Sequence, residues 1–398
     1  MTHRVLAPLS SLATGLSRRR GFIALTIAVL GLGLGAALTV LEIADALFWR
    51  PLPYSGEDRL VFAWQREARG SRLTVTGADF LSWQSEAEPF ESMAAVSARG
   101  FNLATEGEPE RVEGALVSSD FFRVLQPRPL LGRLIEPGPP GPRTAVLSES
   151  LWRRRFGADP GVLGRTLSLD GEPVEVVGVV PAAFRLPVTA QVWVSARARV
   201  PEHPTYPIDP ETDRLRHYLT VIARLRPGVT PGAAAAALSA VQARLARDFP
   251  DQEREVAGAE LTPIREQLFG AARPQVSVLL AVAALLAAVA WVNAGHLFLI
   301  RRTGRAHELA VRVALGASRR SLWLLFVREA VWISLAAGAL ALGLAAWAAP
   351  LLVAASPQAT GLPLPGLSGR VLGLAVLLVL GTGASLAALA GLQPVHAS

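Results

Sequence analysis

Residues 21–41 read GFIALTIAVLGLGLGAALTVL and contain no charged side chain. A helix needs roughly 20 such residues to cross the hydrocarbon core of a membrane, and the sequence stays largely apolar beyond this run. The stretch therefore predicts a first membrane crossing over residues 21–49. A cleaved signal peptide is the alternative, since Ala44-Asp45-Ala46 has the form of a processing site, but the run is long for the apolar region of a signal.

Three glycines lie in the middle of this run. Small residues four apart, as at Gly31 and Gly35, let two helices approach closely in lipid. The letters from Gly31 to Ala36 also fit a relaxed dinucleotide fingerprint, which needs a strand before it and a helix opening at it. Because a position in mid-membrane supplies neither, Gly31 and Gly35 are predicted to be helix-packing positions, and no cofactor is expected.

Further apolar runs occupy the C-terminal third of the chain. Residues 274–300 carry no charge, and the uncharged stretch between Glu329 and Arg370 is about twice as long as one span. Prolines and glycines around residues 350–366 divide that stretch into two. The sequence therefore predicts a membrane α-helical fold, with one transmembrane helix before a large soluble domain and three after it. The three later crossings are expected at residues 274–300, 322–349 and 370–392.

The positive charge of the chain lies in its membrane parts. The formal net charge is +7, yet acidic residues slightly outnumber arginines over residues 50–270. Arginines cluster at residues 18–20 and within 301–320, and the positive-inside rule makes such segments cytoplasmic. Residues 1–20 and both termini are therefore expected on the cytoplasmic side of the membrane, and residues 50–272 on the outer side. A soluble part without basic excess also argues against a nucleic-acid partner.

Missing residue types exclude several kinds of chemistry. No cysteine is present, so the chain can form neither disulfides nor thiolate metal sites. All 39 cationic residues are arginines, so no lysine is available to reach nucleotide phosphates in a P-loop. The six histidines are scattered, and His307-Glu308 lacks the second histidine of a zinc helix. We therefore expect no catalytic residue, no metal site and no ATPase site in this chain.

The outer domain is expected to be mixed α/β. Alternating apolar runs on both sides of Asp170-Gly171 predict a β-hairpin, because Gly tolerates the positive φ that such a turn requires. Residues 219–225 predict a strand, and Thr230 followed by Pro231 predicts the start of a helix that ends before Pro250.

The first part of the outer domain shows the same mixture. Residues 59–64 predict a strand, and residues 79–93 predict a mostly helical segment broken near Pro89. Strand, helix and strand on both sides of a central β-rich piece indicate one subdomain inserted into another.

Three polar residues lie within or at the edge of the later crossings, namely Asn293, His296 and Glu329. A polar group in a membrane is costly and usually faces protein or water, so each is a candidate functional residue. A structural role is favoured over a functional one for these three residues. Asn293 can bond across helices, while His296 and Glu329 lie near the inner end of their helices.

The connection at residues 303–321, TGRAHELAVRVALGASRRS, has the pattern of a short amphipathic helix. Glu308 and Arg312 stand four apart, a spacing that brings two side chains together on one helix face. Periodicity alone leaves two interpretations open: the helix lies on anionic lipid, or it docks a cytoplasmic partner.

Residues 308–331, ELAVRVALGASRRSLWLLFVREAV, resemble the signature that opens the C-terminal part of MacB/FtsX-type ABC transporter permeases. The first apolar run with its RPLPY exit, VSSDFFRVL at 117–125 and YLTVIARLRPGV at 218–229 are similar to further parts of that family. The likeness covers nearly the whole chain in order, and it is greatest to one unit of the duplicated orphan permeases. It favours docking to a partner over lying on lipid.

The resemblance implies a permease in which a separate cytoplasmic ATP-binding subunit drives movement of a periplasmic core domain. That domain would consist of a porter subdomain at about 55–135 and 215–268, with an inserted β-rich subdomain at about 136–214. An FtsX-like permease domain would occupy residues 273–398. Carried over residue by residue, the family's ATPase-coupling segment at 303–320 would include Glu308, Arg312, Leu315, Gly316, Ala317 and Ser318.

The resemblance also implies partners and alternatives. A single unit would form a homodimer or pair with a second permease unit, and a periplasmic adaptor is a further expected partner. Export or efflux is the leading function, with transmission of signal or force to a periplasmic partner as the alternative, and a fragment of a longer duplicated permease as a third interpretation. Glu42 and Asp45 depart from the family pattern, and pairing with Arg50 is one expectation for them.

Overall fold

The computed structural model describes residues 7–104, 108–138, 141–303, 311–312, 314–315, 317–355 and 366–391. The chain divides into two compact units. The first comprises Met1–Arg50 with Ala272–Ser398, and the second is Pro51–Ala271.

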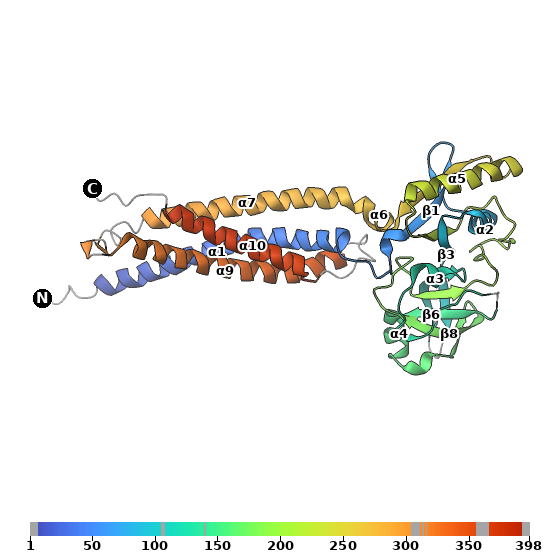
Figure 1. Ribbon diagram of the computed structural model, residues 1–398. Helices are drawn as coiled ribbons and strands as arrows, with labels where there is room; N and C mark the ends of the chain where they lie inside the picture. Colours follow the sequence, from blue (N-terminus) through green and yellow to red (C-terminus); the bar gives the residue numbers. More distant parts are fainter. Residues whose placement is uncertain are drawn as a thin grey trace. The chain divides into compact units, whose positions relative to one another are not determined.

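Four long apolar helices make up the first unit (Figure 1). The spans that are long and apolar enough to cross a membrane are Gly21–Phe48, Ile264–Ile300, Arg320–Val353 and Gly369–Ala388. The predicted order of one helix before the soluble domain and three after it is confirmed. The helices are α1 (Ala7–Phe48), α7 (Arg273–Thr303), α9 (Arg319–Ala355) and α10 (Gly369–Gly391).

Helix α1 is the centre of this bundle, since it runs alongside both α7 and α9 (Figure 1). Leu30 of α1 is fully buried with Ala294 of α7 and Ala330 of α9 in one apolar cluster. A second cluster begins one turn later with Leu34 and Leu38. Small residues opposite leucines allow the helices to approach closely, which in lipid provides the contact that holds them together.

The second unit is a mixed α/β domain built on one sheet of eleven strands. The main path of the sheet runs β11-β1-β10-β3-β4-β9-β6-β8-β5. Most neighbours are antiparallel, but β4 pairs with β9 and β6 pairs with β8 in parallel. The strands are β1 (Leu60–Glu67), β2 (Arg72–Leu73), β3 (Phe90–Ala104), β4 (Glu110–Val117), β5 (Leu131–Gly132), β6 (Thr144–Ser148), β7 (Thr166–Leu169), β8 (Glu172–Val180), β9 (Val192–Ser195), β10 (Thr220–Leu225) and β11 (Val256–Pro263).

Two hydrophobic cores lie against this sheet. The first gathers Phe80 and Trp83 of α2, Leu238 of α5 and strands near them, and the second gathers Phe101 and Leu151. Strand β3 supplies residues to both cores, so it links the two halves of the domain. The helices of the unit are α2 (Gly77–Glu86), α3 (Phe121–Leu125), α4 (Glu149–Phe156), α5 (Pro231–Asp248) and α6 (Ile264–Phe269), with 3-10 turns at Glu57–Arg59, Pro160–Val162 and Gly270–Ala272.

The local predictions for this domain are confirmed except for one. The hairpin forms with Leu169 opposite Glu172, and the Thr230 side chain caps α5 by accepting from the Ala233 N–H. The helix predicted over residues 79–93 is wrong in its second half, because the chain from Phe90 onward is the long strand β3. That segment forms a strand because it pairs with β10 in the middle of the sheet.

Candidate functional site

The predicted coupling segment is described in part. Glu308 and Gly316 lie outside the described residues. The Ser318 hydroxyl accepts a hydrogen bond from the Ser321 N–H at 3.2 Å, so Ser318 caps the start of α9. Ala317 is half-buried against the apolar cluster around Leu30. The end of the segment is thus fixed to the bundle.

Leu315 stands out in this segment. Its N–H donates to the Val311 carbonyl at 3.0 Å, and the Ala317 N–H donates to the Arg312 carbonyl at 3.0 Å. These bonds close a helical turn just before α9. The Leu315 side chain at the tip of the turn is 83 % exposed. A large apolar side chain so exposed beside arginines is suited to contact with another protein.

The glycines of α1 face two different helices. A Cβ added at Gly31 would lie 2.5 Å from Leu340 Cδ2, and one at Gly35 would lie 3.0 Å from Leu344 Cδ1, both on α9. A Cβ at Gly33, which the sequence did not single out, would lie 2.3 Å from Ala290 Cβ on α7. Alternate glycines therefore let α1 approach α9 on one side and α7 on the other.

The three polar residues predicted in the later crossings lie on two helices. Asn293 and His296 are exposed on α7, three positions apart and hence on one face. Glu329 lies on α9 and is half-buried. The structure thus groups Asn293 with His296 on an outward-facing surface of this single chain.

A group of charges joins the end of α1 to the start of α10. The Asp45 carboxylate lies 3.6 Å from the Arg50 guanidinium and 3.8 Å from that of Arg370. Arg50 also donates to the Gly366 carbonyl at 2.6 Å, and Arg370 donates to the Trp49 carbonyl at 3.0 Å. The pairing of Asp45 with Arg50 is one of the arrangements that the sequence leaves open.

Glu42, one turn earlier on α1, is only 1 % exposed. Within the part of the chain that the structure describes, neither of its carboxylate oxygens has a hydrogen-bond partner. An acidic side chain is costly in a membrane helix. Glu42 differs from Asp45 in this respect, because Asp45 is paired with arginines and Glu42 has no such partner in the described residues.

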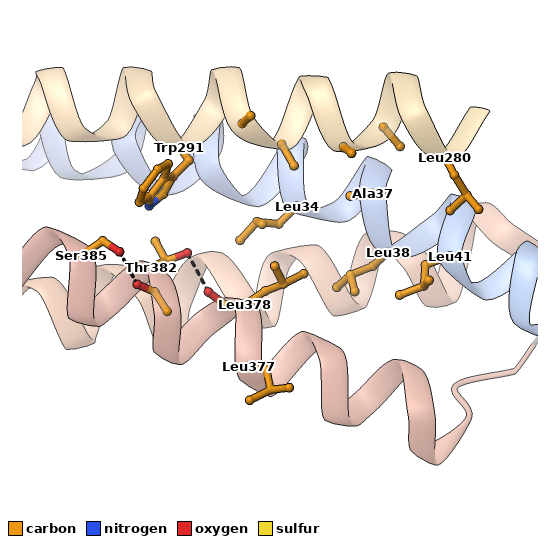
Figure 2. Close-up of a pocket in the computed structure, with 15 residues that line it drawn as sticks. Leu34, Ala37, Leu38, Leu41, Leu280, Trp291, Leu377, Leu378, Thr382 and Ser385 are labelled. Atoms are coloured by element: carbon orange, nitrogen blue, oxygen red, sulfur yellow. Dashed lines mark hydrogen bonds between the residues drawn. The ribbon is translucent and has the colours of Figure 1, made fainter. Parts of the chain in front are cut away.

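An apolar groove of about 520 Å³ opens among α1, α7 and α10 (Figure 2). Leu34 and Leu38 of α1 and Trp291 of α7 line it together with α10. The Thr382 and Ser385 hydroxyls also face it, but they donate to carbonyls of their own helix, at 2.7 and 2.6 Å. With those polar groups satisfied, the groove offers apolar surface and suits hydrocarbon chains.

Among the described residues, no group of three or more His, Asp or Glu side chains could hold a metal ion. His203 and His217 lie in the outer domain, where Nδ1 of His203 accepts from the Thr205 N–H and Nδ1 of His217 is hydrogen-bonded to the Thr74 carbonyl oxygen.

One group of polar residues was missed by the sequence reasoning. Asp79, in the first turn of α2, is fully buried, as is Gln65 of β1. Glu253, between α5 and β11, is 2 % exposed. In the sequence, Asp79 lies three positions after the capping residue Thr76, in the first turn of a helix. Acidic residues are common in first helical turns, where they are usually exposed to solvent. The local sequence therefore does not reveal that this acid is buried.

Comparison with known families gives two matches that together cover most of the chain. Residues 23–241 match the model of the MacB-like periplasmic core domain, and residues 277–397 match that of the FtsX-like permease C-terminal domain.

Curated relatives are similar to half of the chain. The macrolide export ATP-binding/permease protein MacB of Burkholderia thailandensis is 29% identical over 203 residues, which are 48% of this chain and 28% of that protein. The protein of the same name from Burkholderia pseudomallei is 28% identical over the same shares. The matched part is therefore little more than a quarter of the length of these relatives.

Some solved structures are similar over about half of this chain. A domain of a putative permease from Porphyromonas gingivalis has a TM-score of 0.41 and 20% identity, covering 53% of this chain and 92% of that one. The periplasmic region of MacB from Actinobacillus actinomycetemcomitans has a TM-score of 0.39 and 12% identity, covering 56% and 94%.

Proposed function

Because the chain belongs to the MacB/FtsX-type ABC transporter permeases, we propose that it is a permease subunit driven by a separate cytoplasmic ATP-binding subunit. ATP hydrolysis below the membrane would move the transmembrane helices, and the periplasmic domain would shift in response, in export or efflux. No lysine occurs in the sequence, so these residues supply no P-loop themselves, since a P-loop needs that side chain to reach the phosphates.

The exposure of Leu315 is the observation that carries this proposal. A docking contact needs an apolar side chain that can be buried by the partner, with polar groups around it. Leu315 has 83 % of its surface exposed, on the turn that precedes Ser318, the residue that caps the start of α9. Motion of a bound ATPase would therefore be passed to α9 through a short, capped connection.

Co-purification with candidate ATP-binding subunits in lipid nanodiscs tests this role. We expect Leu315→Glu to reduce the amount of co-purifying ATPase and the stimulation of its hydrolysis by about tenfold or more, since hot-spot substitutions cost 2 kcal/mol or above. Glu308→Gln combined with Arg312→Gln should weaken the complex as well.

Leu367→Glu is the matched control. Leu367 is also exposed, at 39 %, but it precedes α10 at the other end of that helix bundle, so this variant should retain the ATPase. Equal binding by wild type and Leu315→Glu would contradict the proposal. ATPase stimulation without substrate movement in vesicles, together with a crosslinked periplasmic partner, would favour transmission of force instead.

A second permease unit is the expected partner within the membrane. Asn293 and His296 share an exposed face of α7, and a polar side chain facing lipid is costly unless another helix satisfies it. We therefore place a homodimer contact, or the contact with a second unit as in duplicated orphan permeases, on this face of α7. A periplasmic adaptor remains a further proposed partner.

The proposed orientation follows the arginine clusters, with both termini in the cytoplasm of the bacterial cell and the domain at residues 50–272 in the periplasm. Within that domain, the core that includes Trp83 would belong to the porter subdomain, at about 55–135 and 215–268. The core that includes Leu151 would be mostly the inserted subdomain, at about 136–214.

A further inference from the structure

A group of four buried polar side chains in the periplasmic domain has no part in the proposed coupling. It brings together Asp79 of α2, Gln65 of β1, Gln242 of α5 and Glu253 of the connection between α5 and β11. The first three are fully buried, and Glu253 is 2 % exposed. Polar groups so removed from water are stable only when hydrogen bonds replace those that water would make.

The Asp79 carboxylate is fully satisfied. Arg214, from the connection that precedes β10, donates to Oδ1, and the Gln65 amide donates to Oδ2. The Arg214 guanidinium also lies over the Phe249 ring, 4.3 Å from its centroid. Arg214, the cation beside these residues, is therefore already paired with Asp79.

The Glu253 carboxyl has fewer donors. Gln242 Nε2 donates to Glu253 Oε2 at 2.7 Å, and the orientation of the Gln242 amide is fixed because its oxygen accepts from Trp83 Nε1 at 3.0 Å. Within the described residues, Glu253 Oε1 and Gln65 Oε1 are buried and have no donor.

A carboxylate only accepts hydrogen bonds, so the unbonded Glu253 Oε1 can bond to another acceptor of this group, such as the Asp79 carboxylate, only when Glu253 carries a proton. The charged groups that act on Glu253 are Asp79 from α2 and Arg214, while β1 and α5 contribute the neutral amides Gln65 and Gln242. One arginine cannot balance two buried carboxylates, and it is already bound to Asp79.

We propose that Asp79 and Glu253 form a proton-binding site, in which one proton on Glu253 completes the hydrogen bonds that hold the connection between α5 and β11 against α2. Burial, with the neighbouring charge and hydrogen bonding of Asp79, raises the pKa of Glu253 to about 8. The site is thus occupied by its proton at neutral pH and empties in mildly alkaline medium.

The direction of the pH effect follows from proton linkage. When the connection opens, Glu253 returns to water and to its ordinary pKa of 4.5. Between that pH and about 8, the closed form binds one more proton than the open form. The equilibrium constant for opening therefore rises about tenfold for each pH unit across this window and levels off above it.

Amide hydrogen exchange of the full chain in nanodiscs, corrected for the pH dependence of intrinsic exchange, measures this opening. The Glu253 N–H donates to the Phe249 carbonyl and the Val256 N–H to the Glu253 carbonyl, so both amides report on it. Their protection should fall about tenfold per pH unit from pH 5 to pH 8 in the wild type, and should not vary in this way in Glu253→Gln. Glu255→Gln, which alters an exposed neighbour, should behave like the wild type.

Infrared spectroscopy of the wild type provides a second measurement that needs no variant to fold. A carbonyl band of a protonated carboxyl group should persist at pH 7 and disappear with a midpoint near pH 8. Protection that is independent of pH in the wild type, or the absence of such a titrating band, would overturn the proposal. A wild-type slope that survives in Glu253→Gln would also overturn it.

Discussion

Arg224 donates from Nε and Nη2 to the main-chain oxygen of Val124, at 2.9 and 2.6 Å, across 100 positions of sequence. Nη2 also donates to the Ser55 carbonyl at 2.7 Å. The Arg224 side chain is fully buried, yet no carboxylate is bonded to it in the described contacts. Main-chain oxygens at the end of α3 and in the segment before β1 are therefore held to β10 by a single guanidinium.

Replacing this arginine should destabilise the periplasmic domain. Arg224→Met keeps much of the side-chain volume but leaves the buried Val124 carbonyl oxygen without the two bonds from Arg224, and the part-buried Ser55 oxygen without one. A buried group left without a partner costs about 1–3 kcal/mol. We expect the free energy of unfolding to fall by about 3 kcal/mol. Chemical denaturation followed by tryptophan fluorescence measures this change.

Arg226→Met is the matched control for that substitution. Arg226 also donates to a main-chain oxygen, that of Glu88 at 2.7 Å, but its side chain is exposed. Water can replace its bond, so the loss should stay below about 1 kcal/mol. Similar losses in the two variants would show that burial of the guanidinium is not the cause.

The sequence predicted this fold where local rules decide it. Charge-free runs of sufficient length gave the membrane helices, and Asp170-Gly171, both with positive φ, gave the hairpin turn. The strand at Phe90 was not predictable locally, because its partner in β10 lies far along the chain. The burial of Asp79 depends on its ion pair with Arg214, which lies 135 positions later in the sequence. Long-range packing, rather than propensity, decides such positions.

The candidate site was predicted unevenly for the same reason. Leu315 and Ser318 belong to a segment whose likeness to a family is local, so they could be named in advance. Gly33 was passed over although its close approach to Ala290 is tighter than the contacts at Gly31 and Gly35. To know which face of a helix contacts which neighbouring helix, one must know how the helices are arranged in the bundle.

A larger side chain at Gly33 should separate α1 from α7. A Cβ there would lie 2.3 Å from Ala290 Cβ and 3.4 Å from the Leu286 carbonyl oxygen, so Gly33→Leu forces the helices apart. Overpacking of this kind costs about 1–3 kcal/mol. The thermal midpoint of the chain in nanodiscs should fall, and crosslinks between cysteines introduced on α1 and α7 should become slower to form.

Gly343→Leu separates this effect from the general cost of changing a membrane glycine. An added Cβ at Gly343 of α9 meets no atom within 4 Å, so that variant should keep the wild-type midpoint and crosslinking. If both variants lower the midpoint equally, close packing at Gly33 is not what stabilises the pair.

His203 should make one loop of the periplasmic domain sensitive to acid. Its Nδ1 accepts hydrogen bonds from the Thr205 and Tyr206 N–H groups, at 3.1 and 2.9 Å, and protonation of that nitrogen would break both. Burial, followed by the nearby charge of Arg216, lowers the pKa of His203 below its ordinary 6.5. The unfolded loop therefore takes up the proton first, and the stability that His203 contributes is present above pH 6.5 and lost as the pH falls through the lowered value.

Hydrogen exchange at the Thr205 and Tyr206 amides, corrected for intrinsic rates, should show protection that decreases as the pH falls below about 6.5. This slope is opposite in sign to the one expected at Glu253, so the two effects can be told apart in one data set. His203→Asn supplies a neutral acceptor and should remove the slope at these amides, while His217→Asn should leave it in place. A slope that persists in His203→Asn would assign the acid sensitivity to another group, because no titrating acceptor would then remain at position 203.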